Sequence, residues 1–465
     1  MTPSMIPFKT AIKWIDIQGR VRTCEPGDFR EKCLKACAFF RDLEAERFTI
    51  LWEPSPEALA MFTGGLLAGK LVCFYSIPNF KLDPEYFHRQ IRGLRQQGLH
   101  TVGSPRFGYL DLDTVFDMRK SRGRAEPVEG YPMDFMQFSS GTTGIRKRIT
   151  YSGRKLISYV DEFSRVLGLQ SDDTIATWTP HYHDEGLIYG FLLPLLTGSD
   201  ILIMSNLDWV MNPEAFLDAC CEYRPAFLTQ PNFAYSLMEH RCRERDLSFM
   251  KCYSVGEVVD HQDCLAFEKK FNTGVVGALG LAEAIYAVTD SDDNTSHLNS
   301  VRNSGRCFGE NQIRIVDGEI VLKSPYLFEG YDTGEESRIY DGWYHTGDEG
   351  VIRDGLLYVL GRRDSVFKVR GQKVLPELIE TQVNRIPGVK KGRNVCFGVD
   401  RAGGGKKAVL LYEGTASERE VANTASALDI EIIRNVPDGW LIKSSSGKIS
   451  RKYCREKYLK EQAEA

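Results

Sequence analysis

The sequence lacks the features that would place it in a membrane, outside the cell or on nucleic acid. No uninterrupted apolar run approaches ~18 residues, so no transmembrane helix is expected. The N-terminal stretch MTPSMIPFKTAIKW has no long apolar segment, so no secretory signal peptide is expected either. A net charge of −4 gives no electrostatic reason to expect nucleic acid or an anionic membrane as a partner.

The cysteines likewise give no indication of a disulfide framework or a metal site. The 12 cysteines form no CxxC pair and show no metal-ligand spacing. Cys33 and Cys37 lie four residues apart in an apolar helical stretch, and Cys220 and Cys221 are adjacent. This distribution favours buried, reduced thiols over disulfides or a zinc site, which is typical of a cytoplasmic protein.

What the sequence does contain is an alternation of strand-like and helix-like segments. A chain of 465 residues exceeds what one hydrophobic core usually fills, so at least two domains are expected. The alternation predicts an α/β protein with largely parallel sheets. Strands are expected at 48–52, 71–75, 201–204 and 226–228, and helices at 28–42, 55–68, 155–167 and 213–222.

The predicted pattern of secondary structure changes in the last third of the chain. From about Ser304 short strands follow one another, and Asp-Gly pairs at 317–318, 341–342 and 354–355 predict tight turns between them. A smaller α+β unit follows, with a helix at 376–386 and strands at 395–399 and 408–412. We predict a large N-terminal domain over residues 1–363 and a small C-terminal domain over residues 364–465.

The sharpest local signal is a loop of small and hydroxylated residues that follows an apolar strand ending at Phe138. Its members are Ser139, Ser140, Gly141, Thr142, Thr143 and Gly144, with Lys147 just beyond. Backbone N–H groups and hydroxyls in such a loop can surround phosphate oxygens. It matches neither a dinucleotide fingerprint nor the GxxxxGK[ST] loop. Taken alone, it is either a phosphate loop or an ordinary Ser/Thr/Gly surface loop.

Three later segments each place one charged residue in a distinctive setting. Asp348 lies in the turn WYHTGDEG, Arg362 in GRRD after a strand, and Lys448 in SSSGKIS near the C-terminus. In isolation, an ordinary turn aspartate and a solvated lysine explain two of them equally well.

Taken together and in order, these segments resemble the adenylate-forming superfamily of acyl-CoA synthetases, peptide-synthetase adenylation domains and luciferases. The resemblance runs from about Phe135 to Arg451 and is closest to the fatty acyl-AMP ligases. Residues 178–187, WTPHYHDEGL, resemble their WLPxYHDxGL segment. Residues 231–235 reproduce their PNFAY, and residues 280–284, GLAEA, resemble their GMAEA.

The resemblance implies that the protein uses ATP and Mg²⁺ to activate a carboxylic acid as an acyl-adenylate, and then transfers the acyl group to a thiol. It assigns the phosphates to the loop 139–144 and Lys147, the metal ion to Glu283, the ribose to Asp348 and Arg362, and the reacting carboxylate to Lys448. The nucleotide site would also include Gly256, Glu257, Leu279, Gly280 and Ala282. The acyl site would include Tyr182, His183, Asp184 and Gly186, where His183 is either a substrate gate or a hydrogen-bonded pocket residue. Asp364 would be the hinge of a mobile C-terminal lid, and Val369, Arg370 and Gly371 would line a thiol tunnel.

Departures from the family pattern bear on the substrate and the thiol. Arg146 stands where a proline is usual, and Leu279 replaces the aromatic residue that usually lies against adenine. The span from Glu283 to Ser304 is short, without the insertion thought to bias fatty acyl-AMP ligases away from coenzyme A. A basic C-terminal stretch, made of Arg451, Lys452, Arg455, Lys457 and Lys460, could steer the docking of an acidic acyl carrier protein. The same charges could equally hold the 3′-phosphate of coenzyme A or form the solvated face of a terminal helix.

Several functions remain open on the sequence alone. The chain could be an acyl-CoA synthetase, or it could adenylate an amino acid or an aryl acid. It could also be a homologue that binds nucleotide without turnover, although the charged residues of all the segments are present together.

Overall fold

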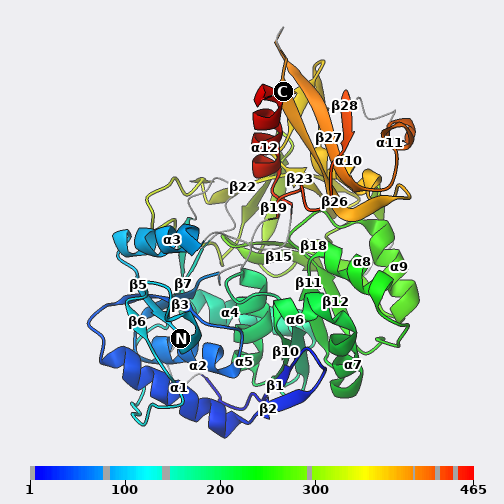
Figure 1. Cartoon of the computed structure of the whole chain (residues 1–465). Helices are drawn as coiled ribbons and strands as arrows, with labels where there is room; N and C mark the ends of the chain where they lie inside the picture. Colours follow the sequence, from blue (N-terminus) through cyan, green and yellow to red (C-terminus); the bar gives the residue numbers. More distant parts are fainter. Residues whose placement is uncertain are drawn as a thin grey trace.

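The computed structural model describes residues 6–76, 84–138, 147–290, 296–401, 404–424, 430–443 and 449–464. Sheets and helices form a large body that holds the N-terminus, and a smaller β-rich unit with the C-terminus stands on top of it (Figure 1). Among the residues in these ranges, no helix is long and apolar enough to cross a membrane.

A seven-stranded sheet forms the centre of the large body. Its order is β13 (Val275–Gly277), β12 (Lys251–Ser254), β11 (Phe227–Gln230), β9 (Thr174–Thr177), β10 (Asp200–Met204), β1 (Ile12–Ile15) and β2 (Val21–Cys24). All neighbours pair in parallel except the terminal hairpin of β1 and β2. The carboxyl ends of β9 to β13 therefore meet at one edge, which is where open α/β sheets place their ligands.

Alternate residues of these strands face two different cores, as the two-residue period of a strand requires. In β10, Ile201 and Ile203 face one core and Leu202 and Met204 the other. The first core is packed by α1 (Pro26–Arg41), α2 (Pro56–Leu67), α4 (Gly153–Leu167), the π-helix η3 (Glu185–Leu192) and α5 (Leu193–Thr197). The second is packed by α6 (Asn206–Met211), α7 (Pro213–Tyr223), α8 (Asn232–Arg241) and α9 (His261–Phe271).

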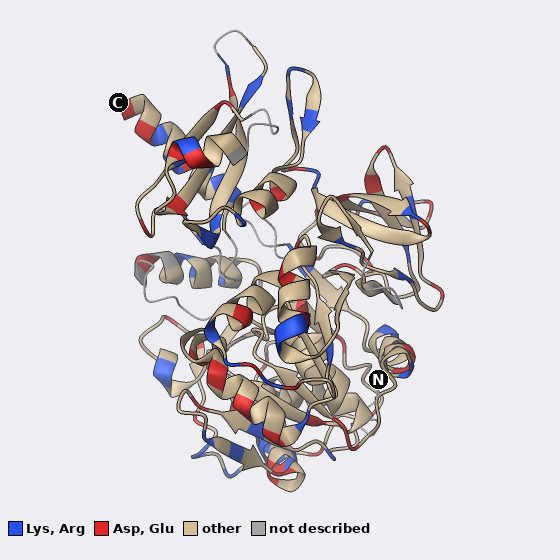
Figure 2. Ribbon diagram, turned by 90° about the vertical axis from the view of Figure 1, so that its right-hand side faces the viewer, with Lys and Arg blue, Asp and Glu red and all other residues tan. Residues whose placement is uncertain are grey.

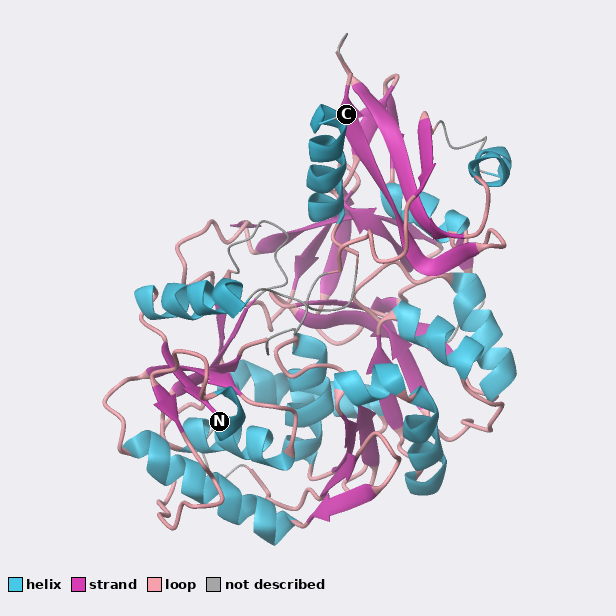
Figure 3. Cartoon of the chain, in the orientation of Figure 1, coloured by secondary structure: helices cyan, strands magenta, loops and turns pink. Residues whose placement is uncertain are grey.

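A second parallel sheet extends the layers on the N-terminal side. Its order is β4 (Leu71–Phe74), β3 (Arg47–Leu51), β5 (His100–Gly103) and β6 (Thr114–Val115), with α3 (Pro84–Gln96) and the short helix η2 (Pro105–Phe107) alongside. The antiparallel hairpin of β7 (Phe135–Phe138) and β8 (Arg148–Tyr151) lies beside it. Figure 3 shows helices between and outside these sheets. This layered arrangement confirms the predicted α/β class.

Local sequence explains where these helices begin and end. In α4 the Ser152 side chain accepts a hydrogen bond from the Lys155 N–H at the N-terminus, and Gly168 ends the helix in the left-handed region at φ 68°. Its buried residues are Leu156, Tyr159, Val160, Phe163 and Leu167, the three- and four-residue spacing of an amphipathic helix. The prediction of a helix at 155–167 is confirmed.

Antiparallel strands connect the two main parts. β19 (Gln312–Val316), β20 (Glu319–Lys323), β22 (Trp343–Arg353), β21 (Ile339–Tyr340) and β23 (Leu356–Arg362) form one sheet, and β14 (Leu279–Leu281), β15 (Ile285–Asp290) and β18 (Arg306–Cys307) another. β16 (His297–Leu298) pairs with β17 (Val301–Arg302). The three Asp-Gly pairs lie in turns, and every one of these residues has a positive φ, as predicted.

The C-terminal unit has hydrophobic clusters of its own. It comprises β24 (Phe367–Val369), β25 (Gln372–Val374), α10 (Pro376–Val383), β26 (Val389–Asp400), β27 (Lys406–Gly414), α11 (Glu418–Thr424), β28 (Ile432–Asn435) and α12 (Arg451–Glu464). Residues between Phe367 and Leu459 form two clusters that include no residue of the large body. Such separate cores are typical of a unit that can move as one body.

Candidate active site

Glu283, Tyr331 and Lys147 meet although they come from three separate segments. Glu283 lies in the turn between β14 and β15, and its Oε1 accepts a hydrogen bond of 2.7 Å from the Tyr331 hydroxyl. The Nζ of Lys147 lies 4.3 Å from the centroid of the same tyrosine ring. Burial, followed by the nearby Glu283 carboxylate, raises the pKa of Tyr331, so this residue remains a hydrogen-bond donor. No motif in the sequence pointed to Tyr331.

In the sequence, the loop of small and hydroxylated residues joins β7 to β8. Ser139, Ser140, Gly141, Thr142, Thr143 and Gly144, together with Arg146, lie outside the described residues. On either side of the loop, Phe138 pairs with Arg148 across the β7–β8 hairpin. Arg148, at a position where the family often has glycine, is buried and pairs with Asp332 at 3.3 Å. Its side chain therefore anchors the hairpin from which the loop extends.

Asp348 and Arg362 face each other across the strands β22 and β23. They are partners in the antiparallel register, and Arg362 Nη1 donates to Asp348 Oδ1 at 3.2 Å. The other oxygen, Oδ2, is buried and has no hydrogen-bond partner within the described part of the chain. Burial raises the pKa of Asp348 to about 6 against the opposing effect of Arg362, and Glu283 raises it further. The Tyr331 hydroxyl, which donates to Glu283, lies 3.5 Å from the hydroxyl of Tyr344 on β22, the strand that carries Asp348. The strand of the Asp348–Arg362 pair is therefore linked to Glu283 through these two tyrosines.

The residues expected beside adenine have mainly backbone and packing roles. Glu257 Oε1 accepts a 2.8 Å hydrogen bond from the Phe233 N–H in the first turn of α8, which links Gly256-Glu257 to the PNFAY segment. Leu279 is buried in the first core, so its side chain offers no exposed platform for a base. The Ala282 carbonyl accepts a hydrogen bond from the hydroxyl of Tyr151. Tyr151 is a further supporting residue that the motifs did not reveal.

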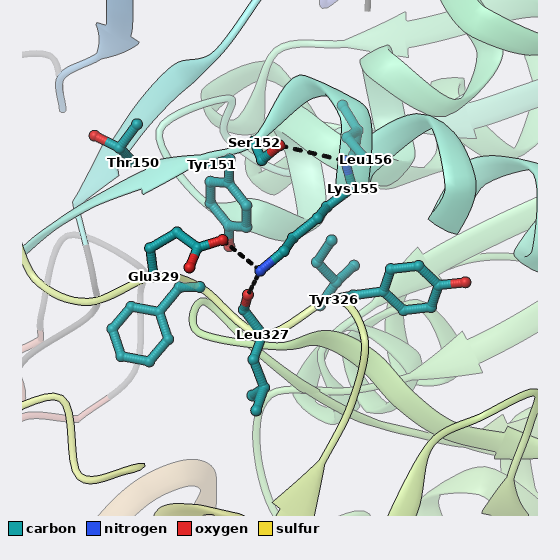
Figure 4. Close-up of a pocket in the computed structure, with 10 residues that line it drawn as sticks. Thr150, Tyr151, Ser152, Lys155, Leu156, Tyr326, Leu327 and Glu329 are labelled. Carbon is teal, nitrogen blue, oxygen red and sulfur yellow. Dashed lines mark hydrogen bonds and ion pairs between the residues drawn. The ribbon is translucent and has the colours of Figure 1, made fainter. Parts of the chain in front are cut away.

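A small cavity behind Tyr151 shows how the Glu283 turn is supported (Figure 4). It is lined by residues of β8, α4 and the segment 326–329. Lys155 Nζ donates to the Leu327 carbonyl at 2.7 Å and pairs with Glu329 at 2.6 Å. The next residue, Phe328, donates its N–H to the Glu283 carbonyl at 2.9 Å. Lys155 thus fixes the segment that holds Glu283 in place.

The expected acyl-site residues lie between β9 and the π-helix η3, except Gly186, which lies in the first turn of η3. Asp184 Oδ1 accepts from the Glu185 N–H at 3.0 Å at the start of η3. At Gly186 a Cβ atom would overlap the carbonyls of Thr179 and Pro180, so only glycine fits. The rings of Tyr182 and His183 are 4.9 Å apart. The structure therefore brings Tyr182, His183, Asp184 and Gly186 together, and it leaves both interpretations of His183 open.

A second cavity opens next to this segment. It is lined by Trp52, Pro54, Ala58, Phe74, Tyr75, Pro180, His181, Tyr182 and Asn206. Burial lowers the pKa of His181 to about 4, so its ring is neutral at physiological pH. Its Nε2 has no hydrogen-bond partner among the residues that the structure describes. The sequence did not single out this histidine.

Two of the basic residues near the C-terminus, Arg451 and Lys457, are held by other residues of the C-terminal unit. Arg451 is held by Glu380 and Ser365 at 2.8 Å and by Glu377 at 2.9 Å. Lys457 donates to the Trp440 carbonyl at 3.1 Å. Figure 2 shows acidic residues between the basic ones along the C-terminal helix. Some of the basic residues expected to dock a partner are thus engaged within the C-terminal unit, because Arg451 neutralises the partly buried carboxylates of Glu377 and Glu380.

Lys448 lies outside the described residues. The described residues on either side of it, Lys443 and Ile449, pair with each other in an antiparallel bridge. The expected hinge, Asp364, is exposed and lies 3.8 Å from Arg362. Of the expected tunnel residues, Val369 is buried in the core of the C-terminal unit. Arg370 and Gly371 form the turn between β24 and β25 at φ 47° and 81°.

Ion pairs made by residues that follow Asp364 in the sequence hold the C-terminal unit on the large body. Lys373 pairs with Glu349 at 2.5 Å, Arg385 with Asp260 at 2.9 Å and Lys391 with Asp263 at 3.0 Å. Asp260 also accepts from the Gln262 and Asp263 N–H groups as the N-cap of α9. Any rotation of the unit about Asp364 would have to break such pairs.

Comparison with known proteins places this geometry in a family context. The model of the AMP-binding enzyme family matches residues 107–332. The medium-chain-fatty-acid–[acyl-carrier-protein] ligase JamA of Moorena producens is 25% identical, over 76% of this chain and 72% of its own length. The long-chain-fatty-acid–AMP ligase FadD26 of Mycobacterium marinum is 23% identical, over 97% and 95%.

Solved structures agree on the fold. A structure from a study of fatty acyl-adenylate ligases of E. coli and L. pneumophila matches with a TM-score of 0.84 and 20% identity, covering 99% of this chain and 97% of that one. McyG A-PCP complexed with phenylalanyl-adenylate matches with a TM-score of 0.87 and 16% identity, covering 98% and 82%. The expected large α/β part, β-rich part and small α+β part are all confirmed.

Proposed function

Because the chain belongs to the AMP-binding, adenylate-forming superfamily, we propose that it activates a carboxylic acid with ATP and passes the acyl group to the phosphopantetheine thiol of an acyl carrier protein. The observation that carries this proposal is the convergence of Lys147, Glu283, Asp348 and Arg362 from distant parts of the chain. In the first step a carboxylate oxygen attacks the α-phosphorus of ATP, and pyrophosphate leaves. In the second the thiol sulfur attacks the acyl carbon, releasing AMP and a proton.

Asp348 and Arg362 support the proposed binding of the ribose. Asp348 Oδ2 is a buried acceptor without a partner among the described residues, and a ribose hydroxyl is a donor of the right kind. Arg362 holds the other oxygen of the carboxylate and so fixes its direction. The loop 139–144 and Lys147 would hold the phosphates beside Glu283.

A Mg²⁺ ion fits the chemistry of Glu283, since hard divalent cations bind carboxylate and phosphate oxygens. Within the described ranges no group of three or more His, Cys, Asp or Glu residues could hold a metal ion. The ion would therefore be held largely by the nucleotide, and when bound it would neutralise phosphate charge. Tyr331 orients the Glu283 carboxylate through its hydrogen bond.

Lys448 would approach the reacting carboxylate and the α-phosphate, where negative charge develops in the transition state. We further propose that residues 364–465 form a lid that rotates about Asp364 between the two steps. The segment 370–371, at the tip of a hairpin, would then replace Lys448 near the acyl-adenylate. The unpaired cysteines suit a cytoplasmic enzyme, since all 12 are free thiols.

The choice of carrier protein over coenzyme A rests on the relatives, one of which is named as an acyl-carrier-protein ligase. A second candidate function is acyl-CoA synthesis. It is favoured by the short span after Glu283 and by a 26% identical enzyme of Rhodococcus jostii, a 3-[(3aS,4S,7aS)-7a-methyl-1,5-dioxo-octahydro-1H-inden-4-yl]propanoyl:CoA ligase, whose match covers 75% of this chain and 71% of its own length. Partial use of the basic tail within the fold also weakens the electrostatic argument for a carrier.

The experiment is pyrophosphate release across fatty, aryl, hydroxy and amino acids, followed by a thiol assay. Carrier proteins bearing phosphopantetheine and free coenzyme A would be compared at matched concentration. Acylation of a carrier without acyl-CoA supports the proposal, whereas efficient acyl-CoA formation without carrier acylation makes the enzyme an acyl-CoA synthetase. Absence of pyrophosphate release with every acid, in a protein that still binds ATP, would indicate a homologue without turnover.

A further inference from the structure

A tyrosine fills the space directly behind the Glu283 turn. Tyr286 lies on β15, three residues beyond Glu283, and its register partner on β14 is Gly280. Its ring lies over Gly280, where a Cβ atom would overlap the ring. Tyr286 is 2% exposed, so the ring is fully packed. The hairpin that carries Glu283 is therefore backed by an aromatic side chain instead of open space.

A directed chain of hydrogen bonds fixes this tyrosine against the expected acyl-site segment. Thr229, at the carboxyl end of β11, donates to Glu185 Oε1 at 3.1 Å. The Thr229 and Tyr286 hydroxyls are 2.6 Å apart, and since the Thr229 proton goes to Glu185, Tyr286 is the donor between them. This chain of hydrogen bonds runs from Tyr286 through Thr229 to the carboxylate of Glu185, the residue that directly follows Asp184.

Two further tyrosines, Tyr189 and Tyr159, form a second layer of packing that begins at the Tyr286 ring. The Tyr189 ring stacks on Tyr286 with centroids 3.7 Å apart, and the Tyr189 hydroxyl accepts from the Tyr286 N–H at 2.7 Å. The Tyr189 hydroxyl also lies 2.9 Å from that of Tyr159. All three tyrosines are buried. An acyl group that extends from Glu283 toward β11 would meet this packed wall.

We propose that Tyr286 closes the acid site at short length, and that the enzyme activates a short acid whose acyl group carries a hydrogen-bond donor directed at Glu185. This inference rests on the proposed function and names its substrate class. Glu185 accepts the hydrogen bond from Thr229, and it directly follows Asp184 in the sequence. Both carboxylates, after burial, raise the pKa of Tyr286, which indicates negative potential at the wall. Such a wall favours a hydroxyl or an amino group and disfavours an alkyl chain.

The test is ATP–pyrophosphate exchange with four acids that separate length from polarity: propanoate, lactate, alanine and palmitate. We expect lactate or alanine to exceed propanoate by about tenfold, and palmitate to fall below propanoate by at least as much. The comparison of lactate with alanine decides between a hydroxyl and an amino donor. Palmitate at or above the short acids overturns the length limit, and propanoate equal to both polar acids overturns the role of Glu185.

Two matched variants separate the ring from its hydroxyl. Tyr286→Phe keeps the ring, so it should keep the length limit. Tyr286→Leu shortens the side chain and should raise palmitate exchange relative to propanoate by about tenfold. Glu185→Gln should reduce the preference for alanine over propanoate. Unchanged selectivity in Tyr286→Leu and Glu185→Gln would show that the acyl group lies elsewhere.

A binding measurement keeps this inference distinct from the proposed function. Calorimetry would compare acyl-sulfamoyl-adenosine analogues that carry lactoyl, propanoyl and palmitoyl groups, because these mimic the acyl-adenylate without turnover. Tighter binding of the lactoyl analogue without exchange from any acid would support the inference and refute the proposed activity. Equal or tighter binding of the palmitoyl analogue would refute the inference even if exchange occurs. Failure of every analogue to bind would refute both.

Discussion

The buried carboxylate of Asp348 offers the sharpest test of the nucleotide site, because burying this group in its ionised form lowers the free energy of unfolding. Its pKa is raised from 3.8 to about 6, first by burial, and this corresponds to about 3 kcal/mol of preference for the protonated carboxyl. The side chain is only 9% exposed, so water screens little of this penalty. Asp348→Asn replaces the carboxylate with a neutral group of the same shape and removes the penalty.

The sign follows from the direction of the shift. A raised pKa means that the folded state binds the proton more tightly than the unfolded state, so the stabilising contribution is present below pH 3.8 and is lost as pH rises through about 6. Asparagine does not titrate. The ligand-free variant should therefore be more stable than the natural protein at about pH 8, by up to about 3 kcal/mol, and the difference should shrink as pH falls below about 6. Arg362 loses the charge of Asp348 but keeps Asp364 at 3.8 Å, and at 45% exposed it can be hydrated.

The assay is urea unfolding of both proteins across this pH range, with and without ATP. Asp348→Asn should also weaken ATP binding by about ten- to a hundredfold, since hydrogen bonds to charged groups contribute about 1.5–3 kcal/mol. The KM for the acid should change much less than the KM for ATP. Parallel stability curves between about pH 5 and pH 8 would refute the burial argument. A change confined to the acid would refute the ribose assignment.

Three further predictions concern the C-terminal unit. Lys448→Ala should reduce adenylation by about 10²–10³-fold yet spare thiol transfer from a preformed acyl-adenylate, and equal loss in both half-reactions would make Lys448 structural. Asp364→Pro should impair one half-reaction far more than the other, measured as pyrophosphate exchange against thioester formation, because proline fixes the backbone at the hinge; near-normal rates in both would mean that Asp364 is not the pivot. Arg451→Leu should destabilise the C-terminal unit by about 3 kcal/mol or more by leaving Glu377 and Glu380 unpaired, seen as faster hydrogen exchange in α10 and β26 with the large body unaffected. Uniform exchange throughout the chain would contradict this local role. Burial raises the pKa of Glu380 against the opposing effect of Arg451, so the stabilising contribution of the cluster should fall as pH rises above 4.5.

Features that depend on neighbouring residues could be predicted from the sequence. The helix expected at 213–222 is α7 (Pro213–Tyr223), and the strand expected at 71–75 is β4 (Leu71–Phe74). The Asp-Gly turns were predictable because few other pairs accept two successive positive φ angles. The site motifs could be placed because each is a short run whose order resembles one superfamily.

Features that depend on distant pairing could not be predicted. Thr229 is 44 residues from Glu185 and 57 from Tyr286, so no local pattern indicates their hydrogen-bond chain. Tyr331 reaches Glu283 across 48 residues for the same reason. The sequence placed Arg451 in a basic run, and it gave no sign of the partners Glu377 and Glu380, because these partly buried residues lie on another helix.

The fit of Gly280 under the Tyr286 ring also restricts how the substrate range of this chain can change. A larger residue at Gly280 is blocked while Tyr286 is present, because its first side-chain atom would overlap the ring. A smaller residue at Tyr286 removes that obstacle, so the two positions can be altered in only one order. Glu283 lies on the hairpin between them. A substitution in the wrong order would therefore displace the carboxylate and lose activity before any new acid could be selected.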